Sequence, residues 1–208
     1  MLQQNAVSTA TLELLKDISA LSQLNSFALG GGTNVALRLG HRFSADLDFF
    51  TNTEFDTQYL FQLISKEFPS SELLFEKRQT MLFSITDVKV DFVLYPFPWL
   101  KPFETIEDIR LLSLKDIIPM KLQAVSNRNA KKDYWDIAAL LDKYSLDEML
   151  KIFITKFPKI DTGFIIHSLT DFEKADTELD PDTFNDRNWE YVKHQLTIEV
   201  KKYTEGLL

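Results

Sequence analysis

Alternating apolar and polar residues predict a β-sheet in the first half of the chain. Three runs show this alternation: residues 72–78, 80–86 and 88–95. A side-chain period of two is typical of strands that bury one face. The first two runs meet near Gln79, which predicts a hairpin. The third run places Val88, Val90, Phe92 and Leu94 on one face.

Apolar residues recur every three or four positions in most of the remaining sequence. This helical period predicts a helix at residues 8–24 and another at 55–68, where Pro69 ends it. From Ser113 onward the same period dominates. It predicts a first helix that begins there and later helices at residues 145–157, 162–172 and 187–203.

Residues 96–102, Pro-Phe-Pro-Trp-Leu-Lys-Pro, contain too much proline for regular structure. We therefore expect a connection there, between an α+β half at residues 1–100 and a helical half at residues 101–208. The fold class predicted from these patterns is α+β, with a sheet and flanking helices followed by a helical C-terminal half.

Residues 27–51 combine turn residues with acidic residues. They predict a short apolar strand, a glycine turn at residues 30–32, a short helix from about Thr33, and a second strand carrying Asp46 and Asp48. Two carboxylates two residues apart on a strand point to the same face. Their repulsion favours a bound cation, and Mg2+ is held by a few carboxylates when substrate phosphates complete its coordination.

The glycines upstream of this pair indicate a phosphate site. Backbone N–H groups at Gly31 and Gly32 can approach a phosphate closely, and the start of the helix adds its positive dipole end. Taken alone, the glycine run is more typical of a simple turn, and the acidic pair of a solvated face or a helix cap; the combination is more specific than either part. Leu47 and Phe49 favour a buried strand around the carboxylates.

Asp91 interrupts the third apolar strand and is a further candidate. A charged residue in such a strand is costly unless it has a partner or a function. The alternative is an edge strand that leaves Asp91 in water. Asp87 is a weaker candidate, because the turn expected there favours Asp for local reasons.

Composition narrows the class of protein. The chain has 208 residues and no cysteine, so disulfides and cysteine–zinc sites are excluded. A formal net charge of −8 argues against a protein that coats nucleic acid non-specifically. No signal peptide or long apolar stretch is visible, so we expect a soluble, cytoplasmic protein without membrane contact.

The stretch Gly-Gly-x-x-x-x-x-Arg-x-Gly-His-Arg-x-Ser-x-Asp-Leu-Asp-Phe-Phe resembles the first motif of the polymerase-β-like nucleotidyltransferases. More narrowly, it resembles the AbiEii/AbiGii-type toxin family, which includes the MenT toxins. The matching positions are Gly31, Gly32, Arg38, Gly40, His41, Arg42, Ser44, Asp46, Asp48 and Phe49. The resemblance implies transfer of a nucleoside monophosphate from a nucleoside triphosphate to an acceptor.

The resemblance also implies roles for particular residues. Asp46, Asp48 and Asp91 would hold Mg2+, in a two-metal site, and act in catalysis. Downstream motifs match at Lys121, Asp133 and Asp136, with Lys121 offsetting triphosphate charge. The nucleotide-binding set implied is Gly31, Gly32, Thr33, Arg38, Arg42, Ser44, Asp133 and Asp136. An ordinary surface pair of Lys132 with Asp136 is the alternative for the downstream segment.

The partners follow from the same resemblance. It implies the toxin of a toxin–antitoxin or phage-defence pair, neutralised by a cognate antitoxin. The acceptor of the nucleotide would be a hydroxyl group on a tRNA-like RNA or on a protein. An antibiotic-modifying nucleotidyltransferase is a neighbouring reading. A non-catalytic nucleotide-sensing or protein-interaction module on the same fold is the alternative from another class. A structural interaction protein would leave the three carboxylates far apart.

Overall fold

The computed structural model describes residues 1–184 and 186–206. The chain forms two compact units, each described separately below. The sheet unit comprises residues 1–38 and 44–113, and the helical unit comprises residues 39–43 and 114–208. The chain therefore enters the helical unit briefly at residues 39–43 before it leaves the sheet unit at Ser113.

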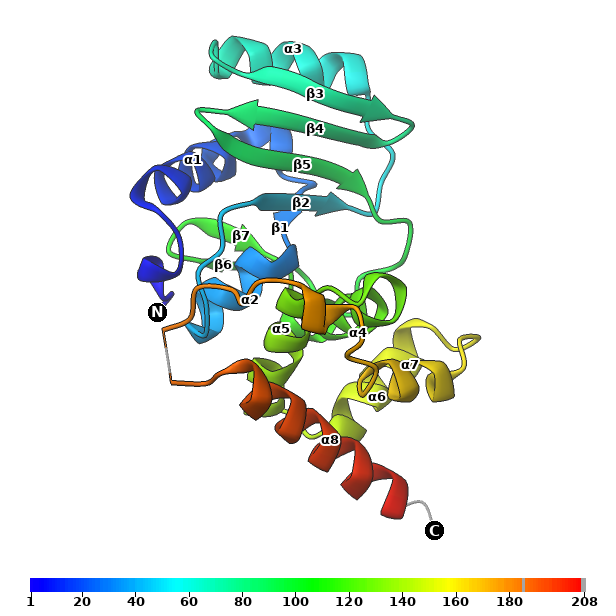
Figure 1. The fold of residues 1–208 in the computed structure, drawn as a ribbon. Helices are drawn as coiled ribbons and strands as arrows, with labels where there is room; N and C mark the ends of the chain where they lie inside the picture. Colours follow the sequence, from blue (N-terminus) through cyan, green and yellow to red (C-terminus); the bar gives the residue numbers. More distant parts are fainter. Residues whose placement is uncertain (185, 207–208) are drawn as a thin grey trace. The chain divides into compact units, whose positions relative to one another are not determined.

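The sheet unit is built on seven strands in the order β3-β4-β5-β2-β1-β7-β6. β2 and β5 are parallel, as are β1 and β7, and the remaining neighbours are antiparallel. Figure 1 shows β3, β4, β5 and β2 side by side in this order. The strands are β1 (Ala28–Leu29), β2 (Leu47–Thr51), β3 (Glu72–Lys77), β4 (Thr80–Ile85), β5 (Val88–Leu94), β6 (Glu104–Ile106) and β7 (Ile109–Leu111).

The predicted alternation in β4 and β5 is confirmed. Met81, Phe83, Val90 and Phe92 are fully buried, whereas the residues between them are more exposed. This buried face packs with apolar residues of α1 (Thr9–Ala20) and α3 (Thr57–Glu67) in one core. The Phe92 ring lies edge-on to the Phe83 ring and stacks at 5.4 Å on the ring of Phe49 in β2.

Side-chain caps set the starts of both core helices. Ser8 accepts a hydrogen bond from the Thr11 amide at α1, and Asp56 accepts one from the Tyr59 amide at α3. α3 ends at Glu67, two residues before the proline that the sequence marks as its stop. Short 3-10 helices, η1 (Gln4–Ala6) and η2 (Ser22–Leu24), flank α1.

Two local expectations differ from the structure. The glycines do not form a separate turn, because α2 (Gly31–Leu39) already begins at Gly31. The chain also continues the sheet beyond residue 100, where β6 and β7 pair with each other and β7 pairs with β1. Residues 101–113 therefore belong to the sheet unit, and its boundary lies later than the expected position at residue 100.

The helical unit is built on five α-helices in its described part. They are α4 (Leu114–Arg128), α5 (Lys131–Leu141), α6 (Leu146–Lys156), α7 (Thr162–Ser168) and α8 (Trp189–Glu205), with a 3-10 helix η3 (Ala175–Thr177). Ser145 and Glu148 form a complete capping box at α6. α4 continues through Pro119 without a break in its assigned span.

Aromatic packing joins α5 to α8. The Trp135 and Trp189 rings stack with centroids 5.4 Å apart, and Lys131 Nζ lies 5.2 Å from the centroid of the Trp189 ring. Tyr134 is fully buried and donates to the carbonyl of Ser168 at 3.0 Å. Among the residues placed by the structure, no helix combines the length and apolar character needed to cross a bilayer.

Arg110 of β7 ties the sheet to the turn that follows α1. Its guanidinium donates to the carbonyls of Phe27 (3.2 Å) and Leu24 (3.1 Å) and also to that of Ser19. We expect Arg110→Met to lower the free energy of unfolding by about 2 kcal/mol, because several partly buried carbonyls lose a charged donor. Urea unfolding measures this, with exposed Arg78→Met as the control, expected within about 0.5 kcal/mol of wild type. Equal stabilities for the two variants would contradict this role.

Candidate active site

Parallel pairing of β2 with β5 brings two predicted acidic residues together. Asp48 lies directly opposite Asp91 in the register, and their carboxyl groups share a hydrogen bond. The Asp91 side chain is 21% exposed. Two carboxyl groups can share a hydrogen bond only when one of them carries a proton. The sheet therefore holds an acidic pair that favours one retained proton.

The pKa of Asp91 reflects this environment. Burial raises it from an ordinary value of 3.8 to about 6, the negative charges of Asp48 and Asp46 add to the rise, and Lys89 opposes it. Lys89 Nζ lies 3.8 Å from Asp91 Oδ2, but its side chain is half exposed. Asp91 thus titrates close to neutral pH, and Asp46, Asp48 and Asp91 share one electrostatic neighbourhood.

Gly31 is required by the position of the Asp48 carboxylate. Its φ is +61°, and a Cβ added there would lie 2.0 Å from Asp48 Oδ2. A side chain at this position would therefore displace the carboxylate and strain the backbone. The Gly31 backbone at the start of α2 consequently lies directly against the Asp48 carboxylate.

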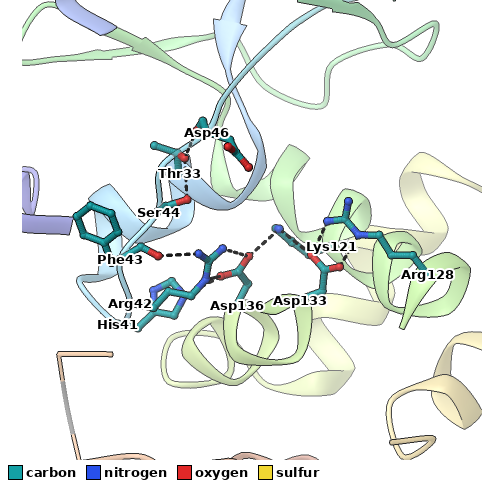
Figure 2. Close-up of polar contacts among 10 residues, drawn as sticks. All are labelled: Thr33, His41, Arg42, Phe43, Ser44, Asp46, Lys121, Arg128, Asp133 and Asp136. Carbon is teal, nitrogen blue, oxygen red and sulfur yellow. Dashed lines mark hydrogen bonds and ion pairs between the residues drawn. The ribbon is translucent and has the colours of Figure 1, made fainter. Parts of the chain in front are cut away.

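The backbone beside Asp46 is held by hydroxyl groups (Figure 2). Thr33 Oγ1 lies 2.8 Å from Ser44 Oγ and donates to the carbonyl oxygen of Asp46. Ser44 also donates its amide to the Ala6 carbonyl at 2.8 Å. The sequence predicted a strand that carries both Asp46 and Asp48, but β2 begins at Leu47, so Asp46 directly precedes the strand. Thr33 and Ser44 therefore position the acidic segment in this structure.

Arg38 lies in a separate set of contacts within the sheet unit. Its guanidinium donates to Asn34 Oδ1 at 3.0 Å, Glu104 Oε2 at 2.9 Å and the Leu112 carbonyl at 3.2 Å. These bonds fix α2 to the segments around β6 and β7. Its predicted contact with the nucleotide stays a prediction, as does that of Gly32 in the first turn of α2.

The remaining predicted residues come together inside the helical unit, around Asp136. Asp136 is fully buried and accepts from Arg42 Nε at 2.7 Å, from Arg42 Nη2 at 3.0 Å and from Lys121 Nζ at 2.6 Å. His41 Nε2 also lies 2.7 Å from Asp136 Oδ1. Figure 2 shows these side chains converging on one carboxylate. Asp136 is therefore not half of an exposed surface pair with Lys132.

Asp133 is the second buried carboxylate of this network. It accepts from Lys121 at 3.0 Å and from Arg128 Nε and Nη2 at 2.6 and 2.8 Å (Figure 2). Burial alone would raise the pKa of Asp136, but Arg42 and Lys121 hold it well below its ordinary value. Burial likewise opposes the charged form of Lys121, while Asp136 and Asp133 raise its pKa. All these groups are thus charged at neutral pH.

The network gives Arg42 and Lys121 a structural role that the sequence did not reveal. Each donates hydrogen bonds to buried carboxylates, and the Arg42 side chain is only 4% exposed. Arg128 was not among the site residues predicted from the sequence, although its spacing of five from Asp133 permits this bidentate pair. The predicted contacts of Arg42, Lys121, Asp133 and Asp136 with a nucleotide stay predictions.

The three carboxylates do not form a ready-made metal site in this structure. Within residues 1–184 and 186–206, no three His, Asp or Glu side chains are grouped as a metal-binding cluster. The donor chemistry nevertheless fits Mg2+, because Asp46, Asp48 and Asp91 offer hard carboxylate oxygens, and burial together with the charges of Asp48 and Asp46 raises the pKa of Asp91. The metal role of these residues therefore stays a prediction.

Comparison with known proteins extends over almost the whole chain. The family profile described as "Nucleotidyl transferase AbiEii toxin, Type IV TA system" matches residues 13–202. An uncharacterized protein of Aquifex aeolicus (strain VF5) is 35% identical over 200 residues, which cover 93% of this chain and 96% of that protein.

Solved structures share the fold at low sequence identity. JHP933 from Helicobacter pylori aligns with a TM-score of 0.60 and 18% identity, covering 97% of this chain and 94% of its own. MenT4, a nucleotidyltransferase toxin from Mycobacterium tuberculosis H37Rv, aligns with a TM-score of 0.59 and 13% identity, covering 92% and 82%.

The mixed sheet with adjacent acidic strands, together with these matches, defines the class of protein as a nucleotidyltransferase. Within that class, the chain belongs to the AbiEii nucleotidyl transferase toxin family. The predicted fold class and the resemblance are thereby confirmed.

The raised pKa of Asp91 predicts a pH-dependent stability. The folded state holds this proton more tightly than the unfolded state, so its contribution is present below pH 3.8 and is lost as the pH rises through about 6. When the pH is raised from 5 to 8 in EDTA, we expect the free energy of unfolding of wild type to fall by about 1 kcal/mol more than that of Asp91→Asn. Urea unfolding at both pH values measures the gap. Asp87→Asn, in the exposed β4–β5 turn, serves as control, and its difference in stability from wild type should not change with pH. If the difference between Asp91→Asn and wild type is equally independent of pH, the assignment is contradicted.

Removal of Lys121 should expose the cost of the buried network. We expect Lys121→Met to lower the free energy of unfolding by about 3 kcal/mol, because it leaves two buried carboxylates with fewer counter-charges. Exposed Lys143→Met is the matched control and should change stability by less than about 0.5 kcal/mol. Chemical denaturation of both variants decides the point, and wild-type stability of Lys121→Met would show that the network is not a buried charge balance.

Proposed function

We propose that this protein is a Mg2+-dependent enzyme that transfers a nucleoside monophosphate from a nucleoside triphosphate to an acceptor. The acceptor would be a hydroxyl group of a tRNA-like RNA or of a protein. The observation that carries the proposal is the pairing of Asp48 with Asp91, with Gly31 packed against the Asp48 carboxylate. Membership in the AbiEii family supports nucleotidyl transfer as the reaction.

Asp46, Asp48 and Asp91 are the residues that would hold Mg2+. When bound there, Mg2+ would neutralise phosphate charge and lower the pKa of an oxygen nucleophile. The backbone amides at Gly31 and Gly32 would donate hydrogen bonds to phosphate oxygens, since they open α2, whose dipole favours an anion at its start.

As the alternative to binding Mg2+, Asp91 itself would accept the proton of the attacking hydroxyl. In the metal-free protein its pKa of about 6 leaves it mostly ionised near pH 7 yet basic enough to take a proton. The hydroxyl oxygen then forms a bond to the α-phosphorus, the bond from that phosphorus to the bridging oxygen breaks, and pyrophosphate leaves. Asp48 repels the charge on Asp91 and so strengthens its basicity.

Family membership also bears on partners. We infer that a cognate antitoxin neutralises this protein and that it works in the cytoplasm, where nucleoside triphosphates and RNA are present. A purely nucleotide-sensing module would not need all three carboxylates that the resemblance implies for catalysis. Asp46, Asp48 and Asp91 are all present in the sequence, which favours the enzyme over that alternative.

The proposal predicts transfer of label from an α-labelled nucleoside triphosphate. With Mg2+ and total cellular RNA and protein, we expect wild type to label one acceptor fraction and Asp48→Asn to lose at least about 100-fold of the rate, because an essential carboxylate is removed. Each of the four nucleoside triphosphates is tested separately.

The matched control is Asp87→Asn, which removes an exposed carboxylate in the β4–β5 turn of the same sheet. It should transfer label at the wild-type rate. Circular dichroism and the midpoint of urea unfolding show whether each variant is folded. A folded Asp48→Asn variant with wild-type turnover would overturn the proposal.

A further inference from the structure

The acidic pair belongs to a row of side chains that crosses four strands. In the register, Asp48 lies opposite Asp91, Asp91 opposite Leu82, and Leu82 opposite Phe75. Directly opposed residues point to the same face of a sheet. Phe75 therefore shares a face with the acidic pair, two strands away from Asp91, or about 10 Å at ordinary strand spacing. Figure 1 shows these four strands in sequence from β2 to the edge strand β3.

This is the face that α1 and α3 leave uncovered within the sheet unit. Their core takes up the alternate positions, where Met81, Phe83 and Phe92 are fully buried. Phe75, by contrast, is 48% exposed. Its half-exposed ring is therefore accessible to a ligand on the face that carries the acidic pair.

A second row runs beside the first and adds positive charge. Lys77 lies opposite Thr80, and Thr80 lies opposite Val93, so Lys77 points to the same face as Phe75. A pocket of about 690 Å³ opens at this corner, within the usual size range of ligand sites. Its lining residues are Glu54, Phe75, Lys77, Arg78, Gln79, Thr80, Leu94 and Pro96.

Within the described residues, the two cations of this pocket have no counter-ion. Neither Lys77 nor Arg78 forms an ion pair with any residue in the described part of the chain, although the protein as a whole carries a net charge of −8. Glu54 is the one carboxylate among the lining residues, so the pocket carries a net charge of +1 from Lys77, Arg78 and Glu54. Its charge complements an anion.

The turn that carries these cations is rigidly held. Gln79 accepts a hydrogen bond from the Phe55 amide at 2.7 Å and returns one to the Phe55 carbonyl at 3.0 Å. The Gln79 carbonyl also accepts from the Leu94 amide at 2.8 Å. The hairpin therefore presents Lys77, Arg78 and Phe75 from a fixed backbone, which reduces the entropy lost on binding.

We propose that this corner, formed by Phe75, Lys77 and Arg78, binds a nucleotide of a single-stranded acceptor strand whose end reaches Asp91. A base would stack on the Phe75 ring, and a backbone phosphate would contact Lys77 and Arg78. An aromatic platform beside unpaired cations is the usual means of holding single strands without sequence preference. The separation from Asp91 equals the rise of about three stacked nucleotides. The inference rests on the proposed transfer and selects nucleic acid, rather than protein, as the acceptor.

The test measures binding without turnover. A labelled single-stranded RNA of about 12 nucleotides and mixed sequence is added to the Asp48→Asn protein, and its binding is followed by fluorescence anisotropy. This measurement requires no catalysis. In this background we expect Phe75→Ala to weaken binding about ten-fold through lost stacking, and Phe75→Tyr to retain it. We expect Lys77→Ala with Arg78→Ala to reduce the slope of log K against log salt concentration by about 1.4.

Matched controls lie on the opposite side of the same unit. Phe61→Ala removes an exposed ring of α3, and Lys16→Ala an exposed cation of α1. Neither should change RNA binding more than about two-fold. In the active protein, the corner variants should raise the KM for the RNA acceptor and leave the KM for the nucleoside triphosphate unchanged.

The outcomes separate this inference from the proposed transfer. RNA binding that depends on Phe75, Lys77 and Arg78, without any label transfer by wild type, supports the corner and rejects the transfer. Transfer without such binding, or corner variants that raise only the KM of the nucleoside triphosphate, overturns the corner. Transfer to protein with no dependence on these residues overturns it as well.

Discussion

The parallel register between β2 and β5 is the constraint on which the sheet unit depends. It places Asp48 opposite Asp91 on one face and, one residue away, the rings of Phe49 and Phe92 in contact on the other. A shift of one residue would exchange the two faces and bury the acids in the core. The hydrophobic packing that fixes the register therefore also imposes the burial and the carboxylate repulsion that together raise the pKa of Asp91.

The parts of the fold visible in the sequence are those with strong local periodicity. The alternation in β4 and β5 and the amphipathic stripes of α1, α3 and α6 gave these elements to within a few residues. β6 and β7 were missed because each has three residues, too few to establish a period. Their identity as strands comes from pairing with each other and with β1, which no local pattern contains.

The site residues also fall into two groups: those that local sequence patterns reveal, and those that depend on contacts between distant parts of the chain. Asp48 and Asp91 were predicted as neighbours, since one lies in a recognisable motif and the other breaks an apolar strand. The bond between Arg42 and Asp136 spans 94 positions, and spacing alone cannot reveal it. Arg42 was expected to face phosphate because guanidinium groups suit phosphate, but they suit a buried carboxylate equally well. Choosing between the two requires the fold.

The excursion of residues 39–43 into the helical unit has a consequence for the order of assembly. During synthesis, His41 and Arg42 leave the ribosome long before Asp136, the carboxylate that both side chains contact. An arginine cannot be buried without its counter-charge, so this short segment must stay hydrated until α5 has emerged. Folding of residues 39–43 is thereby coupled to the second half of the chain. A nascent fragment that ends before α5 cannot bury this segment in its native position.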